Sequence, residues 1–366
     1  MDTKTLSDIC NYRKETVPSN KCDRMTFIST ENMLPNKAGV IISAKCPTSG
    51  NVSKYYPGDV LVSNIRPYFK KIYLADKEGT CSNDVLVFFP KREVCTSDFL
   101  FCLLSTDAFF AHATKTAKGT KMPRGDRSAI MGYQINWVPI NEQSSISEPI
   151  LNIYHKIKLN EKINDNLEQQ ISALYQSWFE DFELTNGVCP ENWHYQELST
   201  IADIASGKRP SVKTPAYSQD TPFPIVGAAS IMGFTSEANH SDKILVIGRV
   251  GTHGVVQRFN TPCWTSDNTL VMKSSYYEFT NQILQRIDYS SMNRGSTQPL
   301  ITQGDMKKVS VLVPDEETLA KFETFASALM NQWEVNKQEN VKLASLRDTL
   351  LAKLMSGVLD VSNIES

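Results

Sequence analysis

The most basic window of the sequence lies between residues 111 and 127, where AHATKTAKGTKMPRGDR combines cationic side chains with glycine and proline. Cations on such a loop suit contact with phosphate groups, and arginine can also donate two hydrogen bonds to one guanine. A loop that is merely solvated is the alternative, because charge runs are common on protein surfaces. The residues of this window that we predict to contact a nucleic acid are Lys115, Lys118, Lys121 and Arg124.

A second candidate segment, NIRPYFKK, leaves a predicted strand through an Arg-Pro-Tyr turn and continues with two lysines. Aromatic and basic groups are interleaved in it, which favours nucleic-acid binding by Arg66, Tyr68 and Lys70. Arg66 and Tyr68 can equally pack against a strand end and cap it, since edge turns favour proline and tyrosine.

The second half of the chain offers comparable residues in SGKRPSVKTP, GRVGTHG and NRGSTQP. The glycines of GRVGTHG do not fit G-x-G-x-x-G, so we interpret this segment as a glycine-kinked hairpin rather than a nucleotide site. A structural or hydrogen-bonding role is favoured for its histidine, which has no Asp or Ser at a catalytic spacing. The candidate binding residues here are Lys208, Arg209, Arg249, His253, Arg294, Thr297 and Gln298.

Composition limits the other possibilities. The net charge is −2, from 38 Lys and Arg against 40 Asp and Glu, so a face that binds nucleic acid has to be local. The first residues, MDTKTLSDICNYRKETV, lack the apolar core of a signal peptide, and we expect a cytoplasmic protein. None of the eight cysteines forms a C-x-x-C, and the five histidines lack metal-ligand spacing, so we expect reduced, mostly buried thiols and no metal site.

The chain repeats itself once. DVLVSNIR from Asp59 matches KILVIGRV from Lys243, and CSNDVLVF from Cys81 matches TSDNTLVM from Thr265, both at an offset of 184. GTKMP matches GSTQP, and the helical segments that follow align at the same offset of 176. LSDI near the N-terminus resembles LSTI from Leu198. A period of about half the chain excludes a solenoid of short repeats and predicts two lobes with internal pseudo-symmetry.

Each repeat ends in a long heptad pattern, in which seam positions are spaced alternately by four and three residues. This periodicity predicts a coiled coil, and a helix of roughly 35 residues is about 50 Å long. The first seam is Ile146, Ile150, Ile153, Ile157, Asn160, Asn164, Leu167, Ile171, Leu174 and Trp178. The second is Leu329, Trp333, Asn336, Asn340, Leu343, Leu350 and Leu354, with Arg347 as an exception.

Two asparagines interrupt each seam, Asn160 and Asn164 in the first and Asn336 and Asn340 in the second. If the helices pair antiparallel, these polar positions meet at the centre. A polar residue in a seam costs stability but fixes the register, which suits a spacer. The alternative is a local polar defect in two ordinary helices.

These patterns predict an α+β fold, in which two globular domains are joined by two long antiparallel coiled-coil helices with an internal pseudo-two-fold repeat. The predicted boundaries are 1–143 for the first globular domain, 144–184 for the first spacer helix, 185–316 for the second domain and 317–358 for the second helix.

The motifs of several enzyme classes are missing from the sequence. It has no G-x-x-x-x-G-K-[ST] of the nucleotide hydrolases and no Pro-Pro dipeptide, which removes the N-P-P-[YF] signature of amino-methyltransferases. Its only Pro-Asp, Pro314-Asp315, is not followed by the acidic-x-Lys element of common Mg²⁺-dependent nucleases. We therefore expect a non-catalytic protein.

The motifs resemble those of the specificity subunits of type I restriction-modification systems over nearly the whole chain. GDVLVSNIRPYFKK and CSNDVLVF are similar to the strand motifs of the first lobe. FPIVGAASIMGF, KILVIGRVGTHGVV and CWTSDNTLVM are similar to a common type of second lobe, and VPINEQ resembles the segment that leads into the spacer helix. The corresponding VPDEET departs from that pattern, with Glu317 where a glutamine is usual.

The resemblance implies two target-recognition domains, each reading one half of a split double-stranded DNA site. Methyltransferase subunits, expected to be two, would dock on the helices, and motor-nuclease subunits would join them. The chain itself would hold no cofactor, because S-adenosylmethionine, ATP and Mg²⁺ would be bound by those partners. Two other hypotheses stay open from the residues alone, a two-lobed adaptor that binds only proteins and a self-sufficient nuclease or methyltransferase with an unrecognised site.

Overall fold

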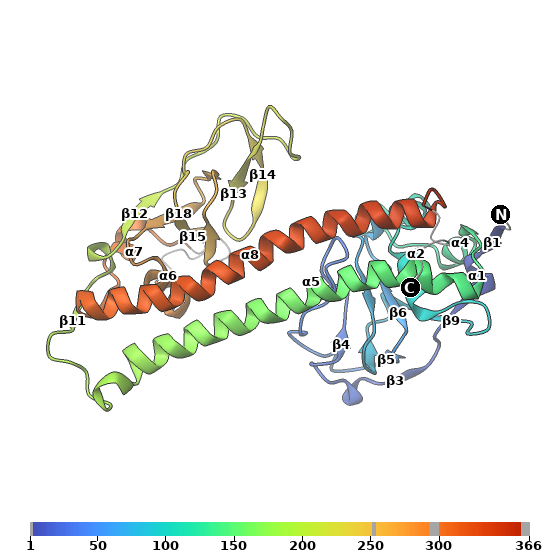
Figure 1. Cartoon of the computed structure of the whole chain (residues 1–366), viewed down its shortest axis with the longest axis horizontal. Helices are drawn as coiled ribbons and strands as arrows, with labels where there is room; N and C mark the ends of the chain where they lie inside the picture. Colours follow the sequence, from blue (N-terminus) through green and yellow to red (C-terminus); the bar gives the residue numbers. More distant parts are fainter. Residues whose placement is uncertain (1–2, 251–253, 293–299, 360–366) are drawn as a thin grey trace. The chain divides into compact units, whose positions relative to one another are not determined.

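The computed structural model of the chain describes residues 3–250, 254–292 and 300–359 (Figure 1). It divides into two compact units, unit 1 with Met1–Asn160 and Lys337–Ser366, and unit 2 with Glu161–Asn336. The two longest helices, α5 (Ile140–Tyr175) and α8 (Glu316–Met355), both run through this division. Each unit therefore consists of one globular domain and a stretch of both helices.

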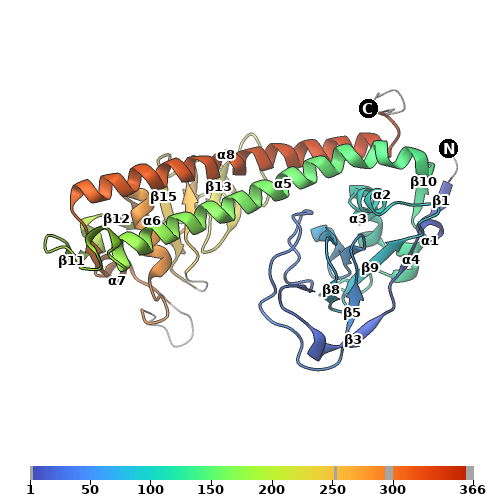
Figure 2. The ribbon, with the colours of Figure 1, turned by 60° about the horizontal axis from the view of Figure 1, so that its bottom comes forward.

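Unit 1 has three layers. One four-stranded sheet, in the order β2-β9-β6-β7, packs one face against helices and the other against a second sheet in the order β3-β5-β8-β4. Alternate side chains of β6 and β9 point to opposite faces, so both faces of the first sheet are buried. Figure 2 shows α2 and α3 on the side of this sheet where α5 passes.

The strands of unit 1 are β1 (Thr3–Thr5), β2 (Cys10–Tyr12), β3 (Thr16–Pro18), β4 (Phe27–Ile28), β5 (Asn51–Tyr55), β6 (Val60–Ser63), β7 (Ile72–Leu74), β8 (Gly79–Cys81), β9 (Val85–Pro90) and β10 (Gln134–Asn136). Its shorter helices are α1 (Leu6–Ile9), α2 (Ser97–Leu104), α3 (Asp107–Lys115) and α4 (Arg127–Met131).

Unit 2 repeats this plan with a four-stranded sheet in the order β12-β18-β15-β16 and a three-stranded sheet in the order β14-β13-β17. Its strands are β11 (His194–Glu197), β12 (Asp203–Ser206), β13 (Phe223–Val226), β14 (Ile231–Thr235), β15 (Ile244–Gly248), β16 (Gln257–Phe259), β17 (Trp264–Thr265), β18 (Thr269–Lys273) and β19 (Ser310–Val313). Its shorter helices are α6 (Tyr277–Arg286) and α7 (Gln303–Lys307).

Backbone hydrogen bonds confirm the predicted repeat. Leu6 N donates to Tyr133 O at 2.9 Å, and Leu198 N donates to Val309 O at 2.8 Å, which places LSDI and LSTI at the same point of the two units. Helices α4 and α7 have equal length and lie 176 residues apart, as predicted for this part of the chain.

The predicted offset is wrong by one residue for the central strands. Val60 of β6 lies opposite Phe88, and Leu245 of β15 lies opposite Met272. Phe88 and Met272 are 184 residues apart, but Val60 and Leu245 are 185 apart, and both of the latter face the helices. A shift of one residue moves every side chain of a strand to the opposite face, so Leu245 and not Ile244 is the counterpart of Val60.

The two long helices pack antiparallel within each unit (Figure 1). In unit 1, residues near Ile150 share the core with Leu351 and Leu354, while the later Asn160 contacts Asn340. Later residues of α5 therefore lie beside earlier residues of α8, so the two helices run in opposite directions. None of the predicted seam residues is exposed, and Arg347, the exception in the pattern, is buried as well.

The seam asparagines face one another in two pairs. In unit 1, Asn160 Nδ2 donates to Asn340 Oδ1 at 2.8 Å and to Glu339 Oε2 at 2.7 Å. In unit 2, Asn336 Nδ2 donates to Asn164 Oδ1 at 2.9 Å. Such directed bonds are made only in one register, but the register role of these residues stays a prediction.

A buried glutamine fixes the start of α5. Gln143 Oε1 accepts a hydrogen bond from Thr96 N at 2.9 Å, and its Nε2 donates to Val94 O at the same distance. At the offset of 176 by which the two helices align, Gln143 corresponds to the buried Leu319 of α8. The departure from the family pattern at Glu317 stays a prediction.

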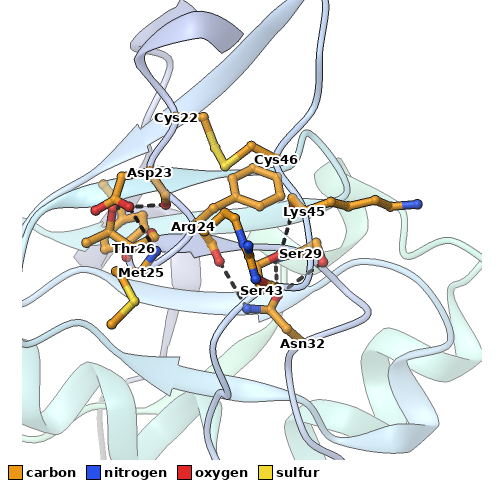
Figure 3. The surroundings of a disulfide bond; sticks show 12 residues. Cys22, Asp23, Arg24, Met25, Thr26, Ser29, Asn32, Ser43, Lys45 and Cys46 are labelled. Atoms are coloured by element: carbon orange, nitrogen blue, oxygen red, sulfur yellow. Dashed lines mark hydrogen bonds between the residues drawn. A yellow bond between two sulfur atoms is a disulfide. The ribbon is translucent and has the colours of Figure 1, made fainter.

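One disulfide corrects the expectation that all the thiols are reduced. Cys22 and Cys46 are bonded, with their Cα atoms 6.1 Å apart, while the other six cysteines are free. Figure 3 shows how the chain between them folds back on itself, with Arg24 Nε donating to Ser43 O at 3.2 Å. No local pattern reveals such a pair, because the two residues are 24 positions apart.

Two kinds of structural feature are absent from the ranges 3–250, 254–292 and 300–359. No helix there combines the length and apolar character that a membrane span requires. No three His, Cys, Asp or Glu side chains in those ranges gather as ligands of a metal ion would.

Candidate nucleic-acid interface

The predicted basic window forms a hairpin of residues 118–124, the basic hairpin. Its ends are joined by two backbone hydrogen bonds of 2.8 Å between Lys118 and Arg124, one in each direction. Gly119 has a φ of 97°, a conformation that only glycine adopts at low cost. Lys118, Lys121 and Arg124 are exposed. The turn therefore presents three cationic side chains to solvent.

The second predicted segment lies against this hairpin. Arg66 N donates to Pro123 O at 2.8 Å, and Arg66 Nη2 donates to Lys121 O at 3.3 Å. The 3-10 turn that follows, Pro67–Phe69, leaves Tyr68 47% exposed. The structure thus brings together two segments that are more than 50 residues apart in the sequence.

A third segment, the turn Ser82-Asn83-Asp84 before β9, completes this edge and was not predicted as part of it. Arg124 Nη2 lies 3.1 Å from Asp84 Oδ1, and Asp84 O accepts a hydrogen bond from Asn64 N at 2.8 Å. Arg127 Nη2 donates to Asn83 O at 3.4 Å. The motif CSNDVLVF marked this turn, but it indicated only a strand.

Two of these cations, Lys118 and Arg124, have acidic neighbours. A hydrogen bond to Asp126, at 2.5 Å, raises the pKa of Lys118 and lowers that of the carboxyl group. Exposed ion pairs of this kind contribute little to stability, so the lysine can exchange its partner for a phosphate group at low cost. Lys115 and Lys121 are exposed, and within the described residues no ion pair involves them.

Lys70 differs from the other predicted residues of unit 1. Its Nζ lies 2.9 Å from Asp107 Oδ1 at the start of α3, and its side chain is only about a third exposed. The same carboxylate oxygen also pairs with Lys37 Nζ, at 3.3 Å. The contact of Lys70 with DNA stays a prediction, but the structure gives this residue a second role within the domain.

In unit 2, Lys208 and Arg209 are exposed and follow β12 after one residue, Gly207. Lys208 N donates to Thr265 O at 2.9 Å, and Lys208 O accepts the indole hydrogen of Trp264 at 2.7 Å. Arg249 directly follows the central strand β15, and its buried Nε has no hydrogen-bond partner among the described residues. The other predicted residues, His253, Arg294, Thr297 and Gln298, lie outside the described residues.

The two units build this edge in the same way. In unit 1, Gly125 N, directly after the basic hairpin, donates to Asn64 O at 3.0 Å. In unit 2, Ile301 N donates to Arg249 O at 2.9 Å, and Arg249 N donates to Asn268 O as Asn64 N does to Asp84 O. Arg249 is thus the structural counterpart of Asn64, whereas the sequence offset of 184 pairs Asn64 with the preceding residue, Gly248.

The family model of the type I restriction modification DNA specificity domain matches residues 1–169 and 190–344, one segment for each repeat. The chain belongs to this family. The resemblance found in its motifs is therefore confirmed.

Curated relatives are similar to this chain over most of its length. The specificity subunit of the type I restriction enzyme HindI from Haemophilus influenzae is 22% identical, with 96% of this chain and 98% of the relative covered. That of MjaIX from Methanocaldococcus jannaschii is 20% identical, with 85% and 80% covered. The crystal structure of the S subunit from M. genitalium superposes with a TM-score of 0.56 at 17% identity, covering 97% and 96% of the two chains.

These findings confirm the predicted function and fold. The chain is a specificity subunit of a type I restriction-modification system, a non-catalytic recognition subunit. Its fold is the predicted α+β arrangement of two domains with two long antiparallel helices. The comparisons give no support to a protein-binding adaptor or to a self-sufficient enzyme.

Proposed function

We propose that units 1 and 2 each read one half of a split DNA target through the edge formed beside the central strand. The observation that carries this proposal is the repeated hydrogen bonding of that edge, Gly125 to Asn64 in unit 1 and Ile301 to Arg249 in unit 2. In unit 1 this arrangement supports the basic hairpin and the turn at Arg66. Two equivalent reading edges in one chain require a target with two parts.

The long helices would then set the distance between the two half-sites. A helix of 36 residues, the length of α5, is about 54 Å long at 1.5 Å per residue. A stiff connection converts two weak half-site contacts into one tight interaction, because the second contact becomes intramolecular. The stiff connection also fixes the number of base pairs between the two half-sites, which neither unit reads.

We further propose that two methyltransferase subunits bind the chain and that motor-nuclease subunits join them. S-adenosylmethionine, ATP and Mg²⁺ would belong to these partners, since the sequence has neither the G-x-x-x-x-G-K-[ST] motif nor the N-P-P-[YF] motif. The repeat supports the number of two, because it offers one surface twice.

Two grooves at equivalent positions illustrate this point. In unit 2, a groove of about 910 Å³ lies between the end of α5 and β19, lined by Tyr175 and Val311 among others. In unit 1, one of about 350 Å³ lies between the end of α8 and β10, lined by Leu351 and Ile135. Tyr175 and Leu351 are 176 positions apart, as are Ile135 and Val311, and this is the repeat offset of the helices.

Substitution of the basic hairpin tests the reading edge of unit 1. In the reconstituted complex, K121A/R124A is expected to weaken binding of the methylation target by about 10–100-fold, the contribution of one or two good base or phosphate contacts. R92A is the matched control, because Arg92 is an exposed arginine beyond the other end of β9. Equal affinity of wild type, K121A/R124A and R92A would contradict this placement.

The split target is tested by sequencing the methylated genome of a host with and without this chain, together with the cognate methyltransferase subunit. We expect a two-part motif only when both proteins are present. A motif in one piece, or a pattern that does not depend on the chain, would refute the proposal.

The number of partners is tested by native mass spectrometry with one blocked groove at a time. Ala352 and Glu180 are exposed residues of the grooves in units 1 and 2. Wild type is expected to bind two methyltransferase subunits, and A352R or E180R only one. Two bound copies in both variants would exclude the grooves as docking sites.

A further inference from the structure

The loop Cys22–Cys46, here called the clamp loop, connects the globular domain of unit 1 to both long helices. Lys37 Nζ lies 2.8 Å from Asp348 Oδ1 of α8 and 3.3 Å from Asp107 Oδ1 of α3. One residue further on, Ala38 O accepts a hydrogen bond from Lys158 Nζ of α5 at 2.7 Å. The clamp loop therefore reaches α5 and α8 through adjacent residues.

The side chain of Lys37 is buried, and its ammonium group pairs with two carboxylates, Asp107 and Asp348, whose side chains stay 67% and 43% exposed. The Lys37 side chain itself is 5% exposed, and its two acidic partners have further cationic neighbours. Asp348 pairs with Arg347 at 3.0 Å, and Asp107 pairs with Lys70 at 2.9 Å. Burial of a charge is costly unless it is paired, so this row of five alternating charges holds one arrangement in place.

The clamp loop also holds the turn that supports the reading edge. Asn36 N donates to Phe69 O at 2.8 Å, and Lys37 N donates to Lys70 O at 2.9 Å. Asn36 and Lys37 have φ values of 57° and 63°, and Lys70 has 51°. Left-handed backbone at non-glycine residues costs conformational energy and persists only where surrounding contacts impose it.

The same turn begins at Arg66, which also has a positive φ, of 50°. Arg66 is bonded to the carbonyl groups of Pro123 and Lys121 in the basic hairpin. A continuous series of short polar contacts thus runs from Asp348 on α8, through Lys37 and the turn, to the hairpin.

We propose that Lys37 is a positioning residue, which sets the angle at which the reading edge of unit 1 is presented by the long helices. The proposal rests on the function proposed above, because it concerns the spacing between two half-sites. The shared hydrophobic core joins the domain to α5 and α8, and the charged contacts of Lys37 add directed bonds that fix the remaining small changes of angle. Without these bonds the reading edge could adopt several angles, and the complex would accept half-sites at neighbouring separations as well.

The test uses the complete methyltransferase complex and a series of duplexes in which the spacer between the half-sites is native, one base pair shorter or one base pair longer. Wild type is expected to methylate the native spacing far faster than the other two. In K37M the ratio of native to altered spacing is expected to fall at least tenfold, and K37R is expected to restore it. D348N leaves Lys37 and Asp107 in place and is expected to give an intermediate ratio.

K156M is the matched control. Lys156 also pairs with an acidic residue of α8 in unit 1, Glu339 at 3.4 Å, but the contacts described for it do not include the clamp loop. Its spacing ratio is expected to equal that of wild type. A wild-type ratio in both K37M and D348N would overturn the proposal, and so would an equal loss of methylation on all three duplexes, which indicates a destabilised domain. A wild-type complex without any spacing preference would instead refute the split target and, with it, this inference.

Discussion

Breaking the Cys22–Cys46 disulfide is expected to destabilise unit 1 and to leave unit 2 unchanged. The bond closes a loop with a sequence separation of 24. The chain-entropy relation gives about 3.5 kcal/mol for a loop of this size at 25 °C, because the bond restricts the unfolded chain more than the folded one. Since about 1.4 kcal/mol corresponds to a factor of ten, the population of unfolded unit 1 should rise by about two to three orders of magnitude.

Hydrogen exchange measured by mass spectrometry can follow the two units separately. Amides of the buried strands β6 and β9 exchange through unfolding of unit 1, and those of β15 and β18 report on unit 2. We expect a thiol reductant to accelerate exchange in β6 and β9 only. The strands of unit 2 are the internal control, because the cysteine buried there, Cys263, is a free thiol.

The variant C22A/C46A should show the same acceleration without any reductant. Alkylation of the released thiols establishes that the bond has been reduced. Unchanged protection of β6 and β9 in the reduced protein would refute the reasoning from loop closure. Equal loss of protection in both units would show that the reductant acts on the chain as a whole.

Three further predictions concern the seam, the interior of unit 2 and the basic hairpin. N160L removes the bond to Asn340 and is expected to cost about 1–3 kcal/mol, whereas N160L/N340L costs less, as a double-mutant cycle in urea can measure. Burial raises the pKa of Glu323 from 4.5 to about 7, so the folded state binds this proton more tightly than the unfolded state does. The contribution of Glu323 to the free energy of unfolding therefore falls as the pH rises from 4.5 to about 7. E323Q keeps an acceptor for Phe279 N and should raise Tm at pH 8 but not below pH 4. K121A is expected to reduce the salt dependence of DNA binding by about 0.9 in the logarithmic slope.

Each of these expectations can fail in a distinct way. Additive effects of N160L and N340L would mean that the two amides are not coupled. A shift of Tm by E323Q that is the same at both pH values would exclude titration of Glu323 as its cause. An unchanged salt slope for K121A would remove this lysine from the phosphate contacts.

The sequence by itself determined the features that depend on local periodicity. Heptad spacing identified both long helices, because side chains seven residues apart lie on one face whatever the rest of the chain does. The seam asparagines met as the antiparallel pairing required, with Asn160 on Asn340. The repeated strand motifs likewise revealed two similar units. Successive side chains of a strand alternate between the two faces of the sheet, and this pattern is also a local property of the sequence.

Only the tertiary structure decided which distant segments meet. The repeated motifs aligned the central strands β6 and β15 one residue out of register, pairing Val60 with Ile244. The hydrogen-bonded ladders show that the counterpart of Val60 is Leu245. The contact of Arg66 with the basic hairpin and the bond of Cys22 to Cys46 likewise join segments that no period relates.

Lys37 is the clearest case of this difference. In the sequence it is one lysine among residues with no periodic pattern. In the folded unit it is buried between Asp107 and Asp348, which follow it by 70 and 311 positions. A charge pair across such separations forms only after the sheet and the helices have brought the chain together, because the closure of long loops is a property of the whole fold.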